Sequence, residues 1–202
     1  MRILLILITF CFLTPQSRGQ SGVMNHLFKD QSIELTPVIN PTFQLSEIVR
    51  QPAYIPGIRA AVLINKKMML GVAYHRLINE LNLPEIDDSC RLGMQWGGIH
   101  FEYTVWPLQR VHLTFPVTAG VGQLKVIGST NDPNTGRSNF IFIEPGWMLE
   151  VIIWKYIKFG IGTSYRITPG WSYQTLRSGD IGGFSAVASV KIGLFNNSKP
   201  GL

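Results

Sequence analysis

The side chains of this sequence that could do chemistry are histidines scattered among apolar residues. His75, His100 and His112, together with two of the glutamates in the same segments, could supply ligands to a metal ion. His100 or His112 could also be the base of a hydrolytic dyad. Neither role has the local spacing that makes such motifs strong, as in His-Glu-x-x-His on a helix. We therefore expect no catalytic residue, no cofactor and no metal site.

Two further patterns point to a site only weakly. Gly120-Val-Gly122 is too short for a nucleotide-binding fingerprint and does not open a helix. Glu85, Asp87 and Asp88 could bind a divalent cation, but they lack the alternating spacing of calcium loops. We interpret the first as interior glycines beside bulky neighbours and the second as a solvated acidic loop.

The elements that carry these residues are predicted from hydrophobic periodicity. Hydrophobic residues make up 46% of the chain and charged residues 15%, and the apolar residues alternate with polar or small ones, which is the period of a strand. This pattern predicts an all-β fold, an eight-stranded antiparallel up-and-down transmembrane β-barrel. The eight expected strands are Ile33–Phe43, Ile58–Asn65, Met68–Leu77, Leu92–Trp106, Arg110–Val126, Asn139–Trp154, Lys158–Ile167 and Gly183–Phe195.

The expected connections alternate in length. Tight turns are predicted at Asn65–Lys67, Pro107–Gln109 and Lys155–Ile157, and long loops at Ser46–Gly57, Ile78–Arg91, Ile127–Ser138 and Thr168–Gly182. Short turns on one rim and long loops on the other are typical of a transmembrane barrel whose turns are periplasmic. Interfacial residues are expected beside the tight turns, namely Trp106, Trp154, Tyr156, Lys66, Lys67, Arg110 and Lys155.

Alternation alone does not separate a membrane barrel from a soluble lipocalin-like one. The apolar set is bulky and continuous, and its exposure to water would create patches larger than a soluble monomer tolerates. We therefore expect the apolar face to point outward to lipid and the small polar face to fill the lumen.

The inward face is expected to carry a structural ladder of paired polar groups, because buried charges need partners. Its members are Glu102, His112, Glu144, Glu150, Arg166 and Lys191, with Arg59, His75, His100 and Lys158 on the same face. Hairpin folding predicts Glu102 near His112 and Glu144 near Arg166. A proton or ion path is the alternative, but side chains just fill an eight-stranded interior.

Pro116 and Pro145 predict an irregularity in the wall. Each lies inside an expected strand, where proline removes a ladder donor and is normally found at edges or bulges. Two bulges at similar height on neighbouring strands are expected, and a weakened seam used for partner docking is the alternative.

The N-terminal residues of the sequence indicate export. Arg2, the apolar run Ile3–Leu13 and the polar exit Thr14–Gln20 predict a signal peptide at 1–20. A periplasmic segment at 21–31, the barrel at 32–195 and a tail at 196–202 follow. Cys11 would leave with the signal peptide, so we expect no intramolecular disulfide in the mature chain. Net charge is +6, or +4 without Arg2 and Arg18, too scattered for nucleic-acid binding.

Several stretches resemble a known family. They read GIRAAVLINKKMMLGVAYHRL, LGMQWGGIHFEYTVWPLQRVHLTFPVTAGVG, FIFIEPGWMLEVIIWKYIKFGIGTSYRITPG and GGFSAVASVKIGLF. They are similar to a family of uncharacterised outer-membrane β-barrel proteins of Bacteroidota, most specifically at Glu144-Pro145-Gly146, Ser164-Tyr165-Arg166 and 191–195. The resemblance implies an outer-membrane barrel with no agreed activity. Asn196–Leu202 extends past the terminal aromatic residue, unlike the family.

These observations favour a non-enzymatic protein of the bacterial outer membrane with a structural, accessory or surface-binding role through long extracellular loops. Its expected partners are outer-membrane lipid and other outer-membrane proteins, and no nucleic acid. A barrel enzyme acting on lipid or lipopolysaccharide, and a secreted ligand-binding barrel, are the alternatives. An enzyme would need outward-facing histidine near the long-loop rim, whereas the strand histidines are expected to face inward.

Overall fold

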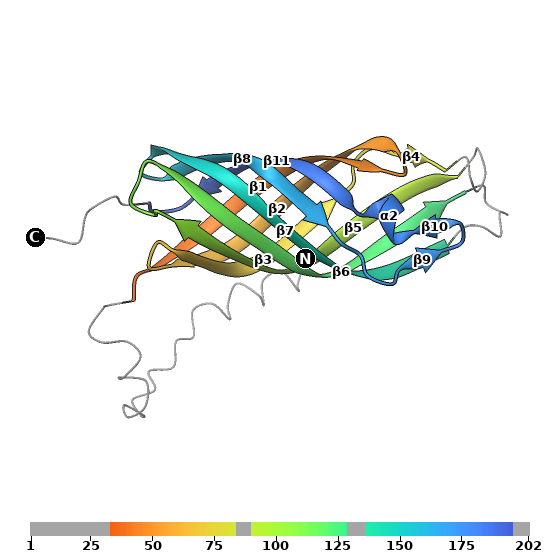
Figure 1. Cartoon of the computed structure of the whole chain (residues 1–202), viewed down its shortest axis with the longest axis horizontal. Helices are drawn as coiled ribbons and strands as arrows, with labels where there is room; N and C mark the ends of the chain where they lie inside the picture. Colours follow the sequence, from red (N-terminus) through yellow and green to blue (C-terminus); the bar gives the residue numbers. More distant parts are fainter. Residues whose placement is uncertain (1–32, 84–89, 129–135, 196–202) are drawn as a thin grey trace, which may run out of the picture. The chain divides into compact units, whose positions relative to one another are not determined.

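A computed structural model of the chain describes residues 33–83, 90–128 and 136–195 (Figure 1). The predicted signal peptide, the 21–31 segment, the 196–202 tail and the acidic group Glu85, Asp87 and Asp88 lie outside these residues.

The described residues form a closed barrel. Its eight main strands are β1 (Leu35–Ile48), β2 (Gln51–Ile64), β3 (Met68–Arg76), β5 (Arg91–Val105), β6 (Val111–Ile127), β7 (Gly136–Trp154), β8 (Ile157–Arg166) and β11 (Gly183–Ile192). Each main strand pairs antiparallel with the next along the chain, and β11 pairs with β1 to close the ring. The predicted fold class, an eight-stranded antiparallel up-and-down barrel, is confirmed.

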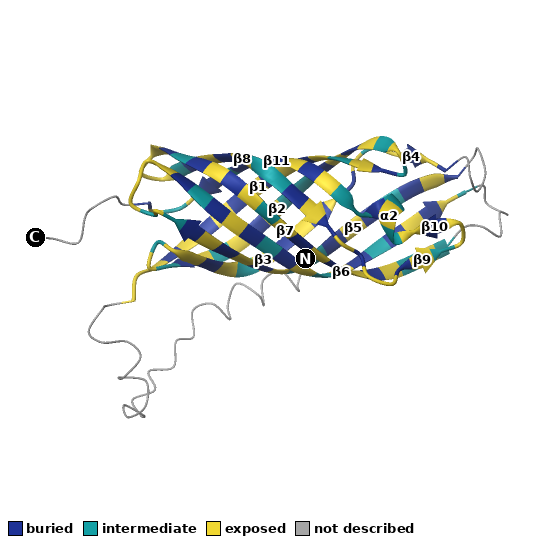
Figure 2. Cartoon of the chain, viewed as in Figure 1, coloured by how far each residue is buried: buried dark blue, intermediate teal, exposed yellow. Residues whose placement is uncertain are grey.

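Side chains alternate in burial along the strands of the wall. Along β7 and its neighbours, buried and exposed residues follow one another, and Figure 2 shows the resulting chequered strands. The outward face carries most of the large exposed hydrophobic residues, for example Ile99, Val121, Ile141 and Phe184. This arrangement follows from the two-residue period of a strand, so a one-residue error in register would reverse the faces.

The barrel has two unlike ends. At the turn end, three short connections join β2 to β3, β5 to β6 and β7 to β8. The barrel's first and last described segments lie there too: Glu34 N donates to Asn65 Oδ1 at 3.0 Å, and Phe195 N donates to the Lys155 carbonyl at 2.7 Å. The opposite end, called the loop end, carries β4 (Leu81–Asn82), β9 (Ser172–Tyr173), β10 (Leu176–Arg177) and α2 (Ser178–Ile181).

The prediction of a long loop at Ser46–Gly57 is wrong. β1 and β2 continue as a paired hairpin as far as Ile48 and Gln51, and the turn between them has positive φ at Val49 (50°) and Arg50 (55°). Positive φ at both central residues is the conformation of a tight hairpin turn. Pro52 and Pro56 lie in this stretch, and proline favours a loop over a strand interior.

The reason that Pro52 and Pro56 are tolerated is the side to which their nitrogens point. Tyr54, of the same parity, donates its N–H to Asn79 Oδ1 at 2.8 Å, on the side of β2 that faces β3 but beyond Gly57, where the β2–β3 ladder ends. A proline nitrogen on that side removes no ladder hydrogen bond. The strands β6 and β7 likewise run further toward the loop end than predicted, to Ile127 and from Gly136.

Among the described residues, no helix has the length and apolar character needed to cross a membrane.

Candidate functional site

The lumen contains three layers of side chains. A small apolar cluster, called the turn-end cluster, consists of Val38, Leu63, Met69 and Phe195, with Ala61 packed against it. A larger apolar cluster, called the loop-end cluster, lies at the other end and includes Trp96, Leu124, Phe140, Trp171 and Ile181. The predicted ladder residues lie in strand segments between the two, so apolar side chains cover the buried polar groups at both ends.

The first polar group of the lumen is centred on Lys191. Its Nζ forms ion pairs with Glu102 and with Glu150. Lys191 is on β11 and Glu102 on β5, and these strands are four places apart in either direction around the ring. The Lys191–Glu102 pair therefore crosses the lumen, and Glu150 on β7 joins it from the side. Bonded side chains from three strands thus meet across the middle of the lumen.

The same group extends toward the turn end. His112 Nε2 lies 3.2 Å from Glu150 Oε2, and Lys158 Nζ lies 3.5 Å from His112 Nε2. The Lys158 Nζ also lies 4.4 Å from the centroid of the Phe195 ring, which belongs to the turn-end cluster. The chain of contacts thus runs from mid-barrel to the apolar cover.

The second polar group is centred on Glu144. Its Oε2 accepts a hydrogen bond from Arg166 Nε at 3.0 Å, and its Oε1 accepts from Ser164 Oγ and Gln44 Nε2, both at 2.9 Å. The Arg166 guanidinium also donates to the Ile181 carbonyl at 3.2 Å and lies 4.0 Å from the centroid of the Trp96 ring. This ion pair has the additional hydrogen bonds that a buried pair requires, and it connects to the loop-end cluster.

Of the two predicted pairs, the structure forms Glu144 with Arg166 and does not form Glu102 with His112. Glu102 lies opposite Pro116 in the β5–β6 register, four residues from His112. His112 lies opposite Glu150 in the β6–β7 register and contacts it. The prediction followed the short connection at Pro107–Gln109 and could not include the strands across the lumen.

The other inward polar residues are less completely paired. Arg59 is 3% exposed, and its Nε and Nη1 have no partner among the described residues. His75 stacks on Trp96 with ring centroids 5.5 Å apart. The buried cations are Arg59, Lys158, Arg166 and Lys191, and the buried carboxylates are Glu102, Glu144 and Glu150, so, histidines apart, the cations outnumber the carboxylates by one. Of these four cations, Arg59 and Lys158 form no ion pair with a described carboxylate, and Lys158 instead contacts His112 and the Phe195 ring.

One arrangement in the lumen has the order of a catalytic triad. His100 Nδ1 lies 2.9 Å from Thr118 Oγ1, and its Nε2 lies 3.8 Å from Glu102 Oε2. His100, Thr118 and Glu102 are all buried, at 0%, 3% and 1% exposure, between the two apolar clusters. A nucleophile must reach its substrate, so this geometry supports a structural role. Across residues 33–83, 90–128 and 136–195, no cluster of His, Cys, Asp and Glu is large enough to hold a metal ion.

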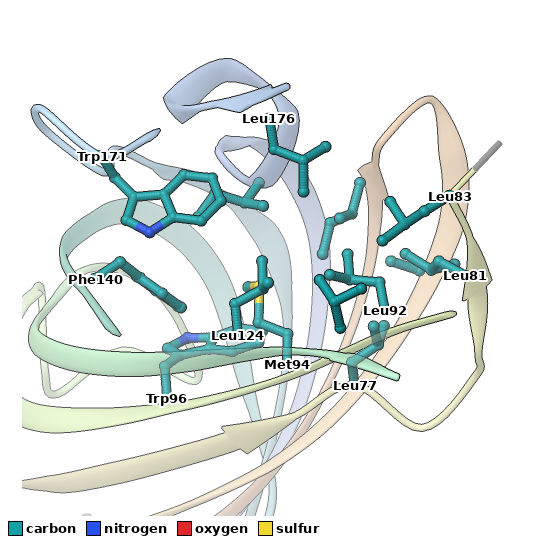
Figure 3. Close-up of a cluster of buried hydrophobic side chains, with 14 of the residues drawn as sticks. Leu77, Leu81, Leu83, Leu92, Met94, Trp96, Leu124, Phe140, Trp171 and Leu176 are labelled. Carbon is teal, nitrogen blue, oxygen red and sulfur yellow. The ribbon is translucent and has the colours of Figure 1, made fainter. Parts of the chain in front are cut away.

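The loop-end cluster is the feature that sequence reasoning missed. Trp171, Leu176 and Ile181 come from the connection between β8 and β11, which the sequence predicts as a plain loop, and they belong to one buried cluster with Trp96, Leu124 and Phe140. Figure 3 shows Trp171 and Leu176 above those three side chains. The Trp171 Nε1 donates to Ser138 Oγ at 3.1 Å. Large apolar residues inside a Gly-, Ser- and Pro-rich stretch were the available signal, because a solvated loop has no need of them.

The wall around Pro116 and Pro145 differs from the expected bulges. β6 and β7 pair at Thr114–Met148 and again at Val117–Pro145, without a change of register, and the pairs between them are absent. The ladder therefore has a gap and no inserted residue. A hollow of about 330 Å³ lies on the outer wall here, lined by Phe115, Pro145, Gly146, Trp147, Thr163, Ser164, Tyr165 and Phe184. The register shift of β7 lies elsewhere, between Ile152 and Trp154.

The predicted interfacial residues lie at the turn end. Trp106 and Trp154 are 60% and 61% exposed, and Trp154 meets Tyr156 edge-on with ring centroids 5.7 Å apart. Lys155 Nζ lies 4.8 Å from the centroid of the Tyr156 ring. Exposed aromatic rings beside basic residues are typical of a membrane interface.

The comparisons with known proteins bear on the fold. No protein-family model matches the sequence, and no curated protein matches it. Among solved structures, the barrel is similar to Neisserial surface protein A, with a TM-score of 0.61, 12% identity, and coverage of 80% of this chain and 99% of that one. It is also similar to Ail, the attachment invasion locus protein of Yersinia pestis, with a TM-score of 0.52, 7% identity, and coverage of 79% and 98%. The chain therefore has the fold of eight-stranded outer-membrane β-barrel proteins.

Proposed function

We propose that this protein is a bacterial outer-membrane barrel without catalytic or channel activity, which has a structural, accessory or surface-binding role through its loop end and outer wall. The observation that carries the proposal is the Lys191–Glu102 ion pair across the lumen. With Glu150, Glu144 and Arg166 it occupies the interior between two apolar clusters. Because the lumen is filled, the surfaces left for function are those outside it.

The outer-membrane location is supported by the outward face. Large exposed hydrophobic residues occur on all eight main strands, and a soluble monomer rarely exposes so large an apolar area. The turn-end aromatic residues would lie at the periplasmic interface and the loop end would face the cell exterior. The proposal includes export by a signal peptide at residues 1–20, followed by a periplasmic segment at 21–31, the barrel at 32–195 and a tail at 196–202. It also includes membership of the Bacteroidota barrel family that the sequence resembles.

Cell fractionation combined with heat-modifiable gel mobility tests the location. We expect the protein in the outer-membrane fraction, with faster migration of the unboiled sample because a closed barrel resists detergent unfolding. A soluble periplasmic or secreted protein without a mobility shift would contradict the proposal and favour a ligand-carrying barrel.

The enzyme alternative has a separate test. Histidine is the most frequent catalytic base, and the described histidines all point into the lumen. We expect outer-membrane lipid composition to be unchanged when the protein is overproduced. A change that disappears in the His100→Ala protein would overturn the non-enzymatic assignment.

A further inference from the structure

Two adjoining grooves lie on the outer wall, near the loop end. Both involve β3, β5, β6 and β7, and they share Gln95 and Gln123. A row of polar outward residues separates them: Arg76 pairs in register with Gln95, Gln95 with Gln123, and Gln123 with Asn139. This row is called the polar row.

The groove on the membrane side of the polar row is mainly apolar. It has a volume of about 630 Å³, and Tyr74, Val121 and Ile141 contribute outward side chains to it. Gly97 forms part of its floor, between Tyr74 and Val121 in the register. A Cβ at Gly97 would lie 2.8 Å from the Ala73 carbonyl oxygen, so the floor there is bare backbone. Pro169 and Gly170 form one side of this apolar groove.

The groove on the loop side of the polar row is basic. It has a volume of about 400 Å³ and is lined by Arg76, Lys125 and Arg137 among others. Lys125 and Arg137 lie directly opposite each other on β6 and β7. Like charges in that position repel one another, and none of the three forms an ion pair with a described residue. By contrast, nearby Arg91 is paired with Glu80 at 3.0 Å.

The polar row also marks a boundary on the outer wall. On its turn side the outward residues are Tyr74, Ile99, Val121 and Ile141, and on its loop side they include Lys125 and Arg137. Tyr74 donates its hydroxyl to Gln95 at 3.0 Å, which places a half-exposed tyrosine at the change from apolar to polar surface. Tyrosine at such a boundary is typical of the headgroup level of a membrane.

We propose that this wall binds an anionic lipid of the outer leaflet. Its phosphate-bearing headgroup lies on Arg76, Lys125 and Arg137, and one acyl chain lies in the apolar groove over Gly97. The inference rests on the proposed outer-membrane location. The occupant is a lipid because the basic groove directly adjoins the apolar one across the polar row, whereas a soluble phosphorylated or sulfated glycan would use only the basic groove. Arginine and lysine are the side chains that hold phosphate oxygens.

The test uses the full-length protein in detergent micelles, titrated with bisphosphorylated lipid A and followed by native mass spectrometry. The R76Q/K125Q/R137Q protein should bind lipid A about tenfold more weakly, as expected for loss of several charge-assisted contacts. The K67Q/R110Q/K155Q protein is the matched control, because it loses the same charge from exposed positions at the turn end. It should bind within about twofold of the unaltered protein.

A second pair of variants tests the apolar groove. V121W places a large ring in the groove and should weaken lipid A binding about fivefold, whereas I39W, at an equally outward position on β1, should not. Lipid A stripped of its acyl chains should bind at least about tenfold more weakly than lipid A. Heat-modifiable mobility establishes that every variant is folded.

The outcomes separate the two proposals. Equal losses in both charge variants would overturn the site, because binding would then follow net charge alone. Equal binding of the deacylated headgroup would also overturn it in favour of a soluble anion. If the protein is heat-modifiable and found in the outer-membrane fraction but does not bind lipid A, this inference is contradicted and the proposed function is unaffected. If the protein is absent from that fraction, the proposed function itself is contradicted.

Discussion

Lys191 on β11 forms an ion pair with Glu102 on β5, the strand farthest from it around the ring. The pair is buried, and Lys191 also pairs with Glu150. Side chains from opposite walls therefore meet in the middle of the barrel. This contact makes the middle of the lumen a packed polar layer. The surfaces left for function are therefore the outer ones.

Removal of Lys191 should destabilise the barrel far more than removal of Arg59. Lys191→Met leaves Glu102 and Glu150 buried without their cation, which typically costs about 3–5 kcal/mol. Arg59→Met removes a buried cation that has no ion pair, so its effect should be much smaller or of opposite sign. Urea unfolding in micelles, followed by tryptophan fluorescence, measures both free energies of unfolding. Equal losses would show that the charges act independently of the pairs seen here.

Loss of the Glu144 carboxylate should also be costly. Glu144→Gln leaves Arg166 buried without its counter-charge and weakens the hydrogen bonds from Ser164 and Gln44, so we expect a loss of about 3 kcal/mol or more in unfolding free energy. Glu34→Gln is the control, because its partner Lys66 is partly exposed and surface pairs contribute about 0–1 kcal/mol. A control that loses as much stability as Glu144→Gln would contradict this difference in burial.

The assignment of faces predicts which tryptophans contact lipid. Trp147 points outward with 49% exposure and Trp96 points inward with 2% exposure. In vesicles containing brominated acyl chains, a variant that retains only Trp147 should be strongly quenched, and one that retains only Trp96 should be nearly unaffected. The reverse result would mean that the faces are inverted, as in a soluble ligand-binding barrel.

The loop-end cluster predicts a local response to truncation of Trp171. Its ring contacts Phe140 edge-on, with centroids 6.4 Å apart, and its side chain is 7% exposed. Trp171→Ala should therefore raise hydrogen exchange in β9, β10 and α2 while the barrel strands stay protected, because elements can open locally. Trp154→Ala, at an exposed turn-end position, should leave that segment unchanged. Unaltered exchange after Trp171→Ala would mean that the ring does not hold the cover.

The face of each residue could be predicted from the sequence, because alternation needs only the two-residue period of a strand. His112, Glu144 and Arg166 were thus placed inward without knowledge of their partners. Cross-lumen partners could not be predicted, since Lys191 and Glu102 are 89 residues apart and meet only through closure of the ring. The register of the two strands joined at Pro107–Gln109 could not be predicted either, which explains the mistaken Glu102–His112 pair.

Two other features, the prolines within β2 and the outer grooves, depend on contacts between strands that are distant in the sequence. Pro52 and Pro56 indicate a loop by themselves, and they fit a strand because the β2–β3 ladder ends at Gly57, before it reaches them. The two outer grooves arise from residues on four strands brought to one level by the register, so no local motif marks them.

Electrical recording tests the closed barrel most directly. The purified protein is inserted into a planar bilayer, and trypsin accessibility of its loop end shows that it spans the bilayer. We predict that this protein produces no conductance above that of the bare membrane. Stable, stepwise ionic currents from the unaltered protein would contradict the account, because they would require a continuous aqueous path through the layer where Lys191 meets Glu102.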